Sequence, residues 1–287
     1  SNATVEVLDG KTGQIVGKPA YFPGAVNRME FAGDSSRLAV SCDGLSGDSA
    51  HVWEFATAEP PGPPLRHRDR ITLLQFSRDG RRLYAVANKP ERAVLVMNAA
   101  TLQVEARWPV AGQAYHALAV SRDGRRVALG AIGSGGLALV DASSGAVLSR
   151  SASPLGGDID NLVFDADGSA VIALDNKGNL IRFSLPDFKV LAQVQIHGGT
   201  ARGLALSPDG RIVASAGFDD RIVLSDAASL KLLRVLVYNN ETANSLAFSP
   251  GGDALAAAGF SPYTVRFWDP RSGNRLSDGP TAPSLVM

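Results

Sequence analysis

The feature that most constrains this fold is a hairpin pattern that recurs along the whole chain. In residues 204–217 an apolar run stops at the turn Ser207-Pro208-Asp209-Gly210, and a second apolar run follows. Two apolar runs joined by a short glycine-containing turn indicate a β-hairpin. The same turn position occurs six times, at intervals of 42 to 45 residues: Ser35, Gly80, Gly124, Gly168, Gly210 and Gly252.

A second motif alternates with the first. It is a short apolar strand closed by a small polar or acidic residue, and its seven copies close at Asp9, Glu54, Asn98, Asp141, Ser184, Asp226 and Asp269. Most copies are followed by another turn and a weaker fourth strand, such as residues 146–149. Each repeat of about 43 residues therefore predicts four short strands and no helix. Four-stranded units at this period are typical of β-propeller blades.

We therefore predict an all-β, seven-bladed propeller of four-stranded antiparallel blades. Six blades are whole, and an N-terminal half-blade closes the ring with the C-terminus, where residues 280–287 supply a further strand, because an open ring would expose two sheet edges. The alternative is an array cut from a longer run of repeats. We assign residues 1–3 to the remnant of an expression tag and residues 4–287 to one domain, with repeats at about 4–18, 19–65, 66–111, 112–154, 155–197, 198–238 and 239–279.

The charge balance excludes some classes of partner. The chain has 28 basic and 28 acidic residues, so nothing in its net charge favours nucleic acid or an anionic membrane, and we expect neither. Its single cysteine, Cys42, excludes an internal disulfide and a multi-cysteine metal site. No window reaches the run of about 18 apolar residues that a membrane span needs. We expect a cytoplasmic monomer, with a periplasmic location left open because the natural start is missing.

The last repeat carries the most specific family signal. Phe248-Ser-Pro-Gly-Gly252, followed by residues 264–273 with the pair Trp268-Asp269, resembles a WD40 repeat. The other repeats match in register, so the resemblance covers residues 4–279. Residues 82–88 and 94–101 also look like the YVTN-type bacterial propellers. The usual Gly-His dipeptide is absent, since His197-Gly198 has the reverse order, and we expect the buried Asp-His-Ser-Trp network of WD40 blades to be mostly missing.

The resemblance implies two functions. The WD40-like repeats resemble those of bacterial proteins that are often fused to signalling modules. They imply a non-catalytic scaffold that binds a protein or peptide. A fused or neighbouring signalling domain is one such partner. The YVTN-like repeats imply the alternative, a lactonase-like hydrolase or small-ligand binder that acts in the central channel.

A column of polar residues marks the candidate binding site. Four residues before each apolar anchor of the first hairpin, where the innermost strand begins, the chain has Asn27, Thr72, His116, Asp160, Arg202 and Asn244. We expect these residues, extended by Arg70 and Asp158, to ring the top mouth of the channel and to contact a partner. The competing interpretation is that they satisfy their own loops. Aromatic residues are expected near the same rim, with about half of them claimed by packing: Tyr21, Phe22, Trp108, Tyr115, Phe218, Tyr238, Phe260 and Tyr263.

Evidence for catalysis is sparse. The four histidines fall in four repeats without metal-ligand spacing, and His116 with Asp160 is the one conceivable acid–base pair. We therefore predict no enzyme, no cofactor and no metal. At the opposite end of the strands, two identical turns in adjacent repeats place six arginines near each other, either as solvated turns or as a site for an acidic partner: Arg78, Arg81, Arg82, Arg122, Arg125 and Arg126.

Overall fold

The structure is a computed structural model of the chain. It describes residues 3–9, 14–22, 24–33, 35–43, 48–55, 65–67, 71–88, 92–110, 114–133, 136–151, 157–238, 242–260 and 264–281. These residues group into two compact units. Unit 1 contains residues 1–115 with 123–125 and 142–145, and unit 2 contains residues 116–122, 126–141 and 146–287. None of the described residues belongs to a helix that is long and apolar enough to span a membrane.

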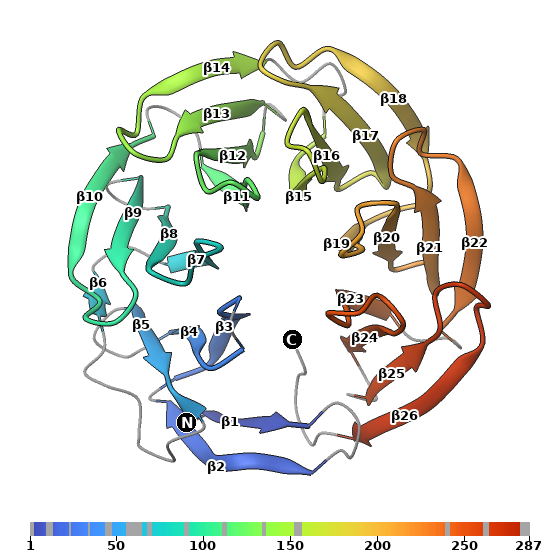
Figure 1. The fold of residues 1–287 in the computed structure, drawn as a ribbon, viewed down its shortest axis with the longest axis horizontal. Coiled ribbons are helices and arrows are strands. Elements are labelled where there is room, and N and C mark those ends of the chain that lie inside the picture. Colours follow the sequence, from blue (N-terminus) through green and yellow to red (C-terminus); the bar gives the residue numbers. More distant parts are fainter. Residues whose placement is uncertain are drawn as a thin grey trace. The chain divides into compact units, whose positions relative to one another are not determined.

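The first three sheets of the chain lie in unit 1 (Figure 1). A two-stranded sheet comes first and two four-stranded sheets follow, with the strands of each sheet in sequence order. The two-stranded sheet contains β1 (Ala3–Leu8) and β2 (Ile15–Phe22). The others contain β3 (Val26–Phe31), β4 (Leu38–Cys42), β5 (Asp48–Trp53) and β6 (Leu65–His67), then β7 (Ile71–Phe76), β8 (Arg82–Ala87), β9 (Ala93–Asn98) and β10 (Val104–Pro109).

Four more four-stranded sheets follow, essentially in unit 2. They contain β11 (Tyr115–Val120), β12 (Arg126–Ala131), β13 (Leu137–Asp141) and β14 (Val147–Ser151); then β15 (Ile159–Phe164), β16 (Ala170–Asp175), β17 (Asn179–Ser184) and β18 (Val190–Gln195). The last two contain β19 (Ala201–Leu206), β20 (Ile212–Gly217), β21 (Arg221–Asp226) and β22 (Leu232–Val237); then β23 (Thr242–Phe248), β24 (Leu255–Phe260), β25 (Thr264–Trp268) and β26 (Arg275–Thr281).

The predicted fold class is confirmed: the chain is an all-β propeller of four-stranded antiparallel blades, with a partial blade at its N-terminal end. The end of the chain differs from the expectation. Pro280 and Thr281 are the last residues of β26, the fourth strand of the last blade, and do not begin a further strand. Residues 282–287 lie outside the described part, so closure by both termini stays a prediction.

The repeated turns have the predicted chemistry. All six turn residues have positive φ, from 55° at Ser35 to 73° at Gly168 and Gly210, a region that glycine enters at little cost. In one turn the hydroxyl of Ser77 donates to Asp79 Oδ1 at 2.6 Å, and the backbone N–H of Arg81 donates to the same oxygen at 3.1 Å. These bonds lower the pKa of Asp79. The aspartate of each such turn therefore stabilises the scaffold.

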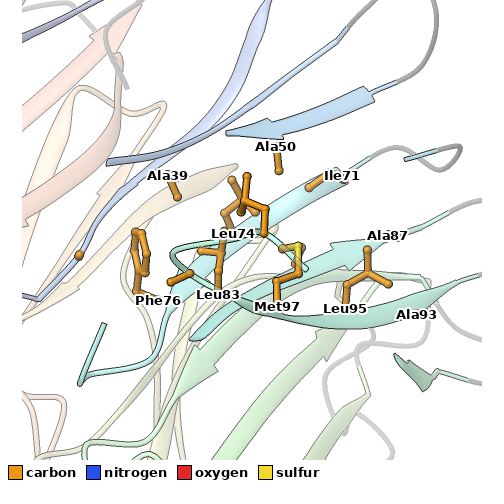
Figure 2. Close-up of a cluster of buried hydrophobic side chains, with 14 residues drawn as sticks. Ala39, Ala50, Ile71, Leu74, Phe76, Leu83, Ala87, Ala93, Leu95 and Met97 are labelled. Atoms are coloured by element: carbon orange, nitrogen blue, oxygen red, sulfur yellow. The ribbon is translucent and has the colours of Figure 1, made fainter. Parts of the chain in front are cut away.

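The apolar core lies between successive sheets. In the cluster between the β3–β6 and β7–β10 sheets, small side chains of the first face large ones of the second (Figure 2). Ala39 and Ala50 lie opposite Leu74, Leu83 and Met97, all 5% exposed or less. Alanine on one face lets the neighbouring sheet approach closely enough for the larger side chains to fill the space. Similar clusters join each pair of successive sheets in unit 2, from β11–β14 onward.

Arginines at the start of second strands tie neighbouring blades together. Arg37 donates to the carbonyl of Gly80 at 2.8 Å, and its guanidinium lies 5.7 Å from the ring centre of Phe76. Arg126, two blades further along the chain, has the same arrangement. It donates to the carbonyl of Gly168 at 2.9 Å, and its guanidinium lies 6.0 Å from the ring centre of Phe164. Each arginine reaches one repeat ahead, to the turn of the next blade, and adds a charge-assisted bond to the apolar packing.

The outer strands share an irregularity. In each of five blades the register between the third and fourth strands skips one residue of the fourth strand, which is a β-bulge. The skipped residues are Glu105, Leu148, Leu191, Leu233 and Leu276. The four leucines are between 51% and 54% exposed, although leucine is usually buried.

Replacing Gly145 by alanine tests the close packing between blades. Gly145 has φ +73°, and a Cβ there would lie 2.1 Å from Cδ1 of Trp108. Gly124 has a similar φ, +70°, but nothing lies within 4 Å of its Cβ position, so Gly124→Ala is the matched control. We expect Gly124→Ala to lower the free energy of unfolding by about 1 kcal/mol through backbone strain alone, and Gly145→Ala by about 2–4 kcal/mol. Equal losses in chemical denaturation would contradict the predicted contact.

Candidate functional site

The polar column lies at a second set of β-bulges. In five innermost strands the register with the next strand skips one residue, and the skipped residues are Asn27, Thr72, Asp160, Arg202 and Asn244. For example, Ile159 pairs with Asp175 and Asn161 pairs with Leu174, which leaves Asp160 without a partner. A bulge bends the strand and redirects the side chain of the extra residue. The sequence predicted these positions as strand starts and did not predict the bulges.

Exposure changes sharply at these positions. The residues that precede the column are mostly buried, for example Tyr115 and Ile159 at 0% and 1%. The next residues reach solvent: His116 and Arg202 are exposed and Asp160 is half-buried. The strand starts therefore offer polar side chains on top of an apolar layer, which is the arrangement that a binding surface needs.

Unit 2 brings four of the predicted residues into one electrostatic cluster. Burial raises the pKa of Asp160 above its ordinary value. The guanidinium of Arg202 and the imidazole of His116 oppose this rise in the pKa, and the carboxylates of Asp158 and Asp175 add to it. Interactions of this kind require the groups to lie near each other. A half-buried carboxylate with a raised pKa is a group that a cation from a partner would stabilise.

Arg202 is held by its surroundings. Its guanidinium lies 5.6 Å from the ring centre of Phe218, a cation–π arrangement, and its backbone carbonyl accepts a hydrogen bond from Asn161 Nδ2 at 3.1 Å. Phe218 is itself 41% exposed. An exposed arginine supported by an exposed aromatic ring is a combination that interfaces favour.

Other members of the predicted site satisfy their own loops. Asn27 Nδ2 donates to Asp43 Oδ1 at 2.5 Å. Thr72 Oγ1 accepts from Asn88 Nδ2 at 2.8 Å. Asp158 accepts from the backbone N–H of Gly133 and from Asn176 Nδ2. These three residues fit the competing interpretation that strand-start residues satisfy their own loops.

Two predicted site residues remain. Asn244 Oδ1 is buried and has no hydrogen-bond partner among the described residues. Arg70 lies outside the described residues.

A buried histidine network appears where the sequence argued against it. His197 Nδ1 lies 2.9 Å from Asp219 Oδ1, and Nε2 lies 2.9 Å from Ser215 Oγ. Burial lowers the pKa of His197 below its ordinary value although Asp219 opposes the shift, so the ring is neutral at pH 7. A carboxylate can only accept, so Nδ1 carries the proton and Nε2 accepts from the serine. The Asp-His-Ser part of the network is therefore present in this blade, because the reversed His197-Gly198 order still places the ring beside Ser215 of β20.

The aromatic residues divide between packing and surface. Phe22, Trp108, Tyr115 and Tyr238 are buried, whereas Tyr21 is 71% exposed. The side chain of Phe260 and all of Tyr263 lie outside the described residues. Among the six aromatic side chains that the structure describes, four are buried by packing, and the exposed ring of Phe218 adjoins the predicted site residue Arg202.

Sequence reasoning missed Glu30, on the inner strand β3. Burial raises its pKa to about 7 from the ordinary 4.5, against the opposing charge of Arg28. A glutamate among the apolar residues of a strand carries no spacing signal, so only its surroundings reveal the shift. Among the described residues, no group of three or more His, Cys, Asp or Glu side chains could hold a metal ion.

Glu30→Gln tests the buried carboxyl. Between about pH 4.5 and 7 the folded protein keeps a proton that the unfolded chain has released, so stability falls as the pH rises through this window. We expect the variant to gain about 1–2 kcal/mol over the wild type above pH 7, less than the full shift implies because Glu30 is partly exposed, and to match it below pH 4.5. The measurement is chemical denaturation across this pH range. A variant that is less stable at high pH would refute the buried, raised-pKa carboxyl.

The comparisons with known proteins agree with this fold. Residues 188–226, which contain His197, Ser215 and Asp219, match the family model described as WD domain, G-beta repeat. A search of curated proteins finds no match. Among solved structures, the chain is similar to the β-propeller domain of Cps50 (Swd1) from Myceliophteria thermophila, with a TM-score of 0.76 and 19% identity over 90% of this chain and 87% of that chain. The chain is thus a β-propeller with a segment, residues 188–226, that matches the WD40 repeat.

Proposed function

We propose that this propeller is a non-catalytic scaffold that binds a protein or peptide partner through the starts of its innermost strands. The observation that carries the proposal is the charged cluster of unit 2, in which Asp160, His116 and Arg202 interact electrostatically at the solvent end of buried strands. The match of residues 188–226 to the WD40 repeat supports it, because WD40 propellers generally bind protein partners.

The chemistry of the cluster favours a peptide with charged groups of both signs. Arg202 offers a guanidinium to a carboxylate, and Asp160 offers a half-buried carboxyl to a lysine or arginine. Phe218 adds apolar contact area beside Arg202. Asn27 and Thr72 satisfy their own loops in unit 1, and we propose no direct contact for them. We include a fused or neighbouring signalling domain among the proposed partners.

The double variant Asp160→Asn/Arg202→Gln tests the proposal. Peptides selected from a displayed random library on the wild type should bind the variant about tenfold more weakly or worse, since both charged contacts are removed. The thermal midpoint should not fall, because replacing a carboxyl of raised pKa by a neutral amide removes a desolvation cost. The matched control is Asp187→Asn/Lys189→Gln, an exposed ion pair of 3.8 Å in the same unit. Unchanged binding in the double variant, or equal loss in the control, would overturn the proposed site.

A second candidate function rests on the same residues. The raised pKa of Asp160 and the nearby imidazole of His116 are what an acid–base pair in a hydrolase would need. We expect no turnover of a panel of lactones by the wild-type protein. Turnover that His116→Ala abolishes, with the fold retained in circular dichroism, would replace the scaffold by the hydrolase.

A further inference from the structure

The six turn arginines that the sequence singled out have two different roles. Those at the start of second strands are engaged: Arg82 contacts Glu105 at 3.4 Å and the carbonyl of Ala142 at 3.4 Å, and Arg126 binds Gly168. The arginines within the turns, Arg78, Arg81, Arg122 and Arg125, are exposed. No side-chain hydrogen bond or ion pair of these four occurs among the described residues.

Three of the exposed arginines share one surface of unit 1. Arg82 reaches the carbonyl of Ala142, and the backbone N–H of Ala142 donates to the carbonyl of Arg125 at 2.8 Å. Ala142 therefore links the turn that holds Arg78 and Arg81 to the turn that holds Arg125. We call Arg78, Arg81 and Arg125 the basic patch.

Three acidic side chains described beside the basic patch make contacts within their own turns or blade. Asp79 accepts from Ser77 and from the backbone of Arg81, and Asp123 accepts from the backbone N–H of Arg125 at 3.0 Å. Glu105 pairs with Arg82. The adjoining residues 99–103 and 142–145 carry no charge. The three guanidinium groups of the patch stand against the two carboxylates of Asp79 and Asp123, so these residues carry one net positive charge.

The corresponding turns of unit 2 lack this excess. Residues 165–169 contain two aspartates and no base, residues 207–211 contain one arginine, and residues 249–253 contain none. A hairpin of this kind therefore needs no arginine for its geometry, because the serine and aspartate of the turn make the bonds that hold it. The fold therefore does not require arginine at positions 78, 81 and 125.

We propose that the basic patch is a docking surface for an acidic peptide segment of a partner protein. The guanidinium group of arginine binds a carboxylate through two parallel hydrogen bonds. Three guanidinium groups on adjacent turns can therefore bind several acidic side chains of one peptide. Nucleic acid fits less well. The carboxylates of Asp79 and Asp123 interrupt the patch, the protein has no net positive charge to attract a polyanion, and no aromatic residue of these turns could stack on a base.

The test compares two triple variants with the same change in net charge. Arg78→Ser/Arg81→Ser/Arg125→Ser removes the patch, and Lys177→Ser/Lys189→Ser/Arg211→Ser removes three exposed bases of unit 2. The probe is a labelled peptide of alternating glutamate and serine, about twelve residues long, at low salt, where surface charges act most strongly. We expect the first variant to bind it at least about tenfold more weakly than the wild type, and the second within about twofold.

Further arms separate this surface from the charged cluster of Asp160, His116 and Arg202. Arg202→Ala should leave binding of the acidic peptide unchanged. The triple variant that removes the basic patch should still bind the peptides selected from the random library on the wild type. The proposal would be overturned if both triple variants bound the acidic peptide equally weakly, or if only Arg202→Ala lost that binding. It would also be overturned if the wild type did not bind the peptide, or bound a single-stranded oligonucleotide of the same charge more tightly. Should the triple variant unfold, the single variants Arg81→Ser and Arg125→Ser give the same comparison at reduced amplitude.

Discussion

The structure depends on apolar packing between the faces of successive sheets. A four-stranded blade has two apolar faces, and one neighbour covers only one of them. The inner strand β15 shows how one strand packs against both neighbouring blades. Leu162 and Phe164 pack into the cluster with β11–β13, whereas Val163 packs into the cluster with β19–β21. Alternate residues of one strand thus serve two interfaces, which is why the strands read as unbroken apolar runs.

The two-sided packing also explains where function can be placed. Along a strand buried on both faces, a polar side chain without a partner costs free energy. A bulge at the strand start escapes this constraint, because the extra residue leaves the alternating pattern. Asp160 and Arg202 therefore reach solvent directly after residues that are buried. The scaffold restricts candidate binding residues to the ends of its strands.

The sequence predicted the period, the hairpin turns and the strands well, because a turn such as Ser207–Gly210 is determined by neighbouring residues. It could not predict the bulges, since skipping Asp160 depends on how β16 aligns with β15. Nor could it separate Arg81 from Arg82. The two are adjacent and both are exposed, yet only the side chain of Arg82 reaches Glu105 and the carbonyl of Ala142. The network of His197, Ser215 and Asp219 was missed because its members are close in space and separated in sequence.

The bulges of the outer strands have a consequence for solubility. Each fourth strand lies at the edge of its sheet, where a row of backbone donors and acceptors faces away from the other strands. An exposed leucine on such a strand would invite a second sheet to add to it. The extra residue at Leu148, Leu191, Leu233 and Leu276 breaks the even spacing of that row. An incoming strand would therefore lose hydrogen bonds at the point where its apolar contact is best, which protects an array of open edges from aggregation.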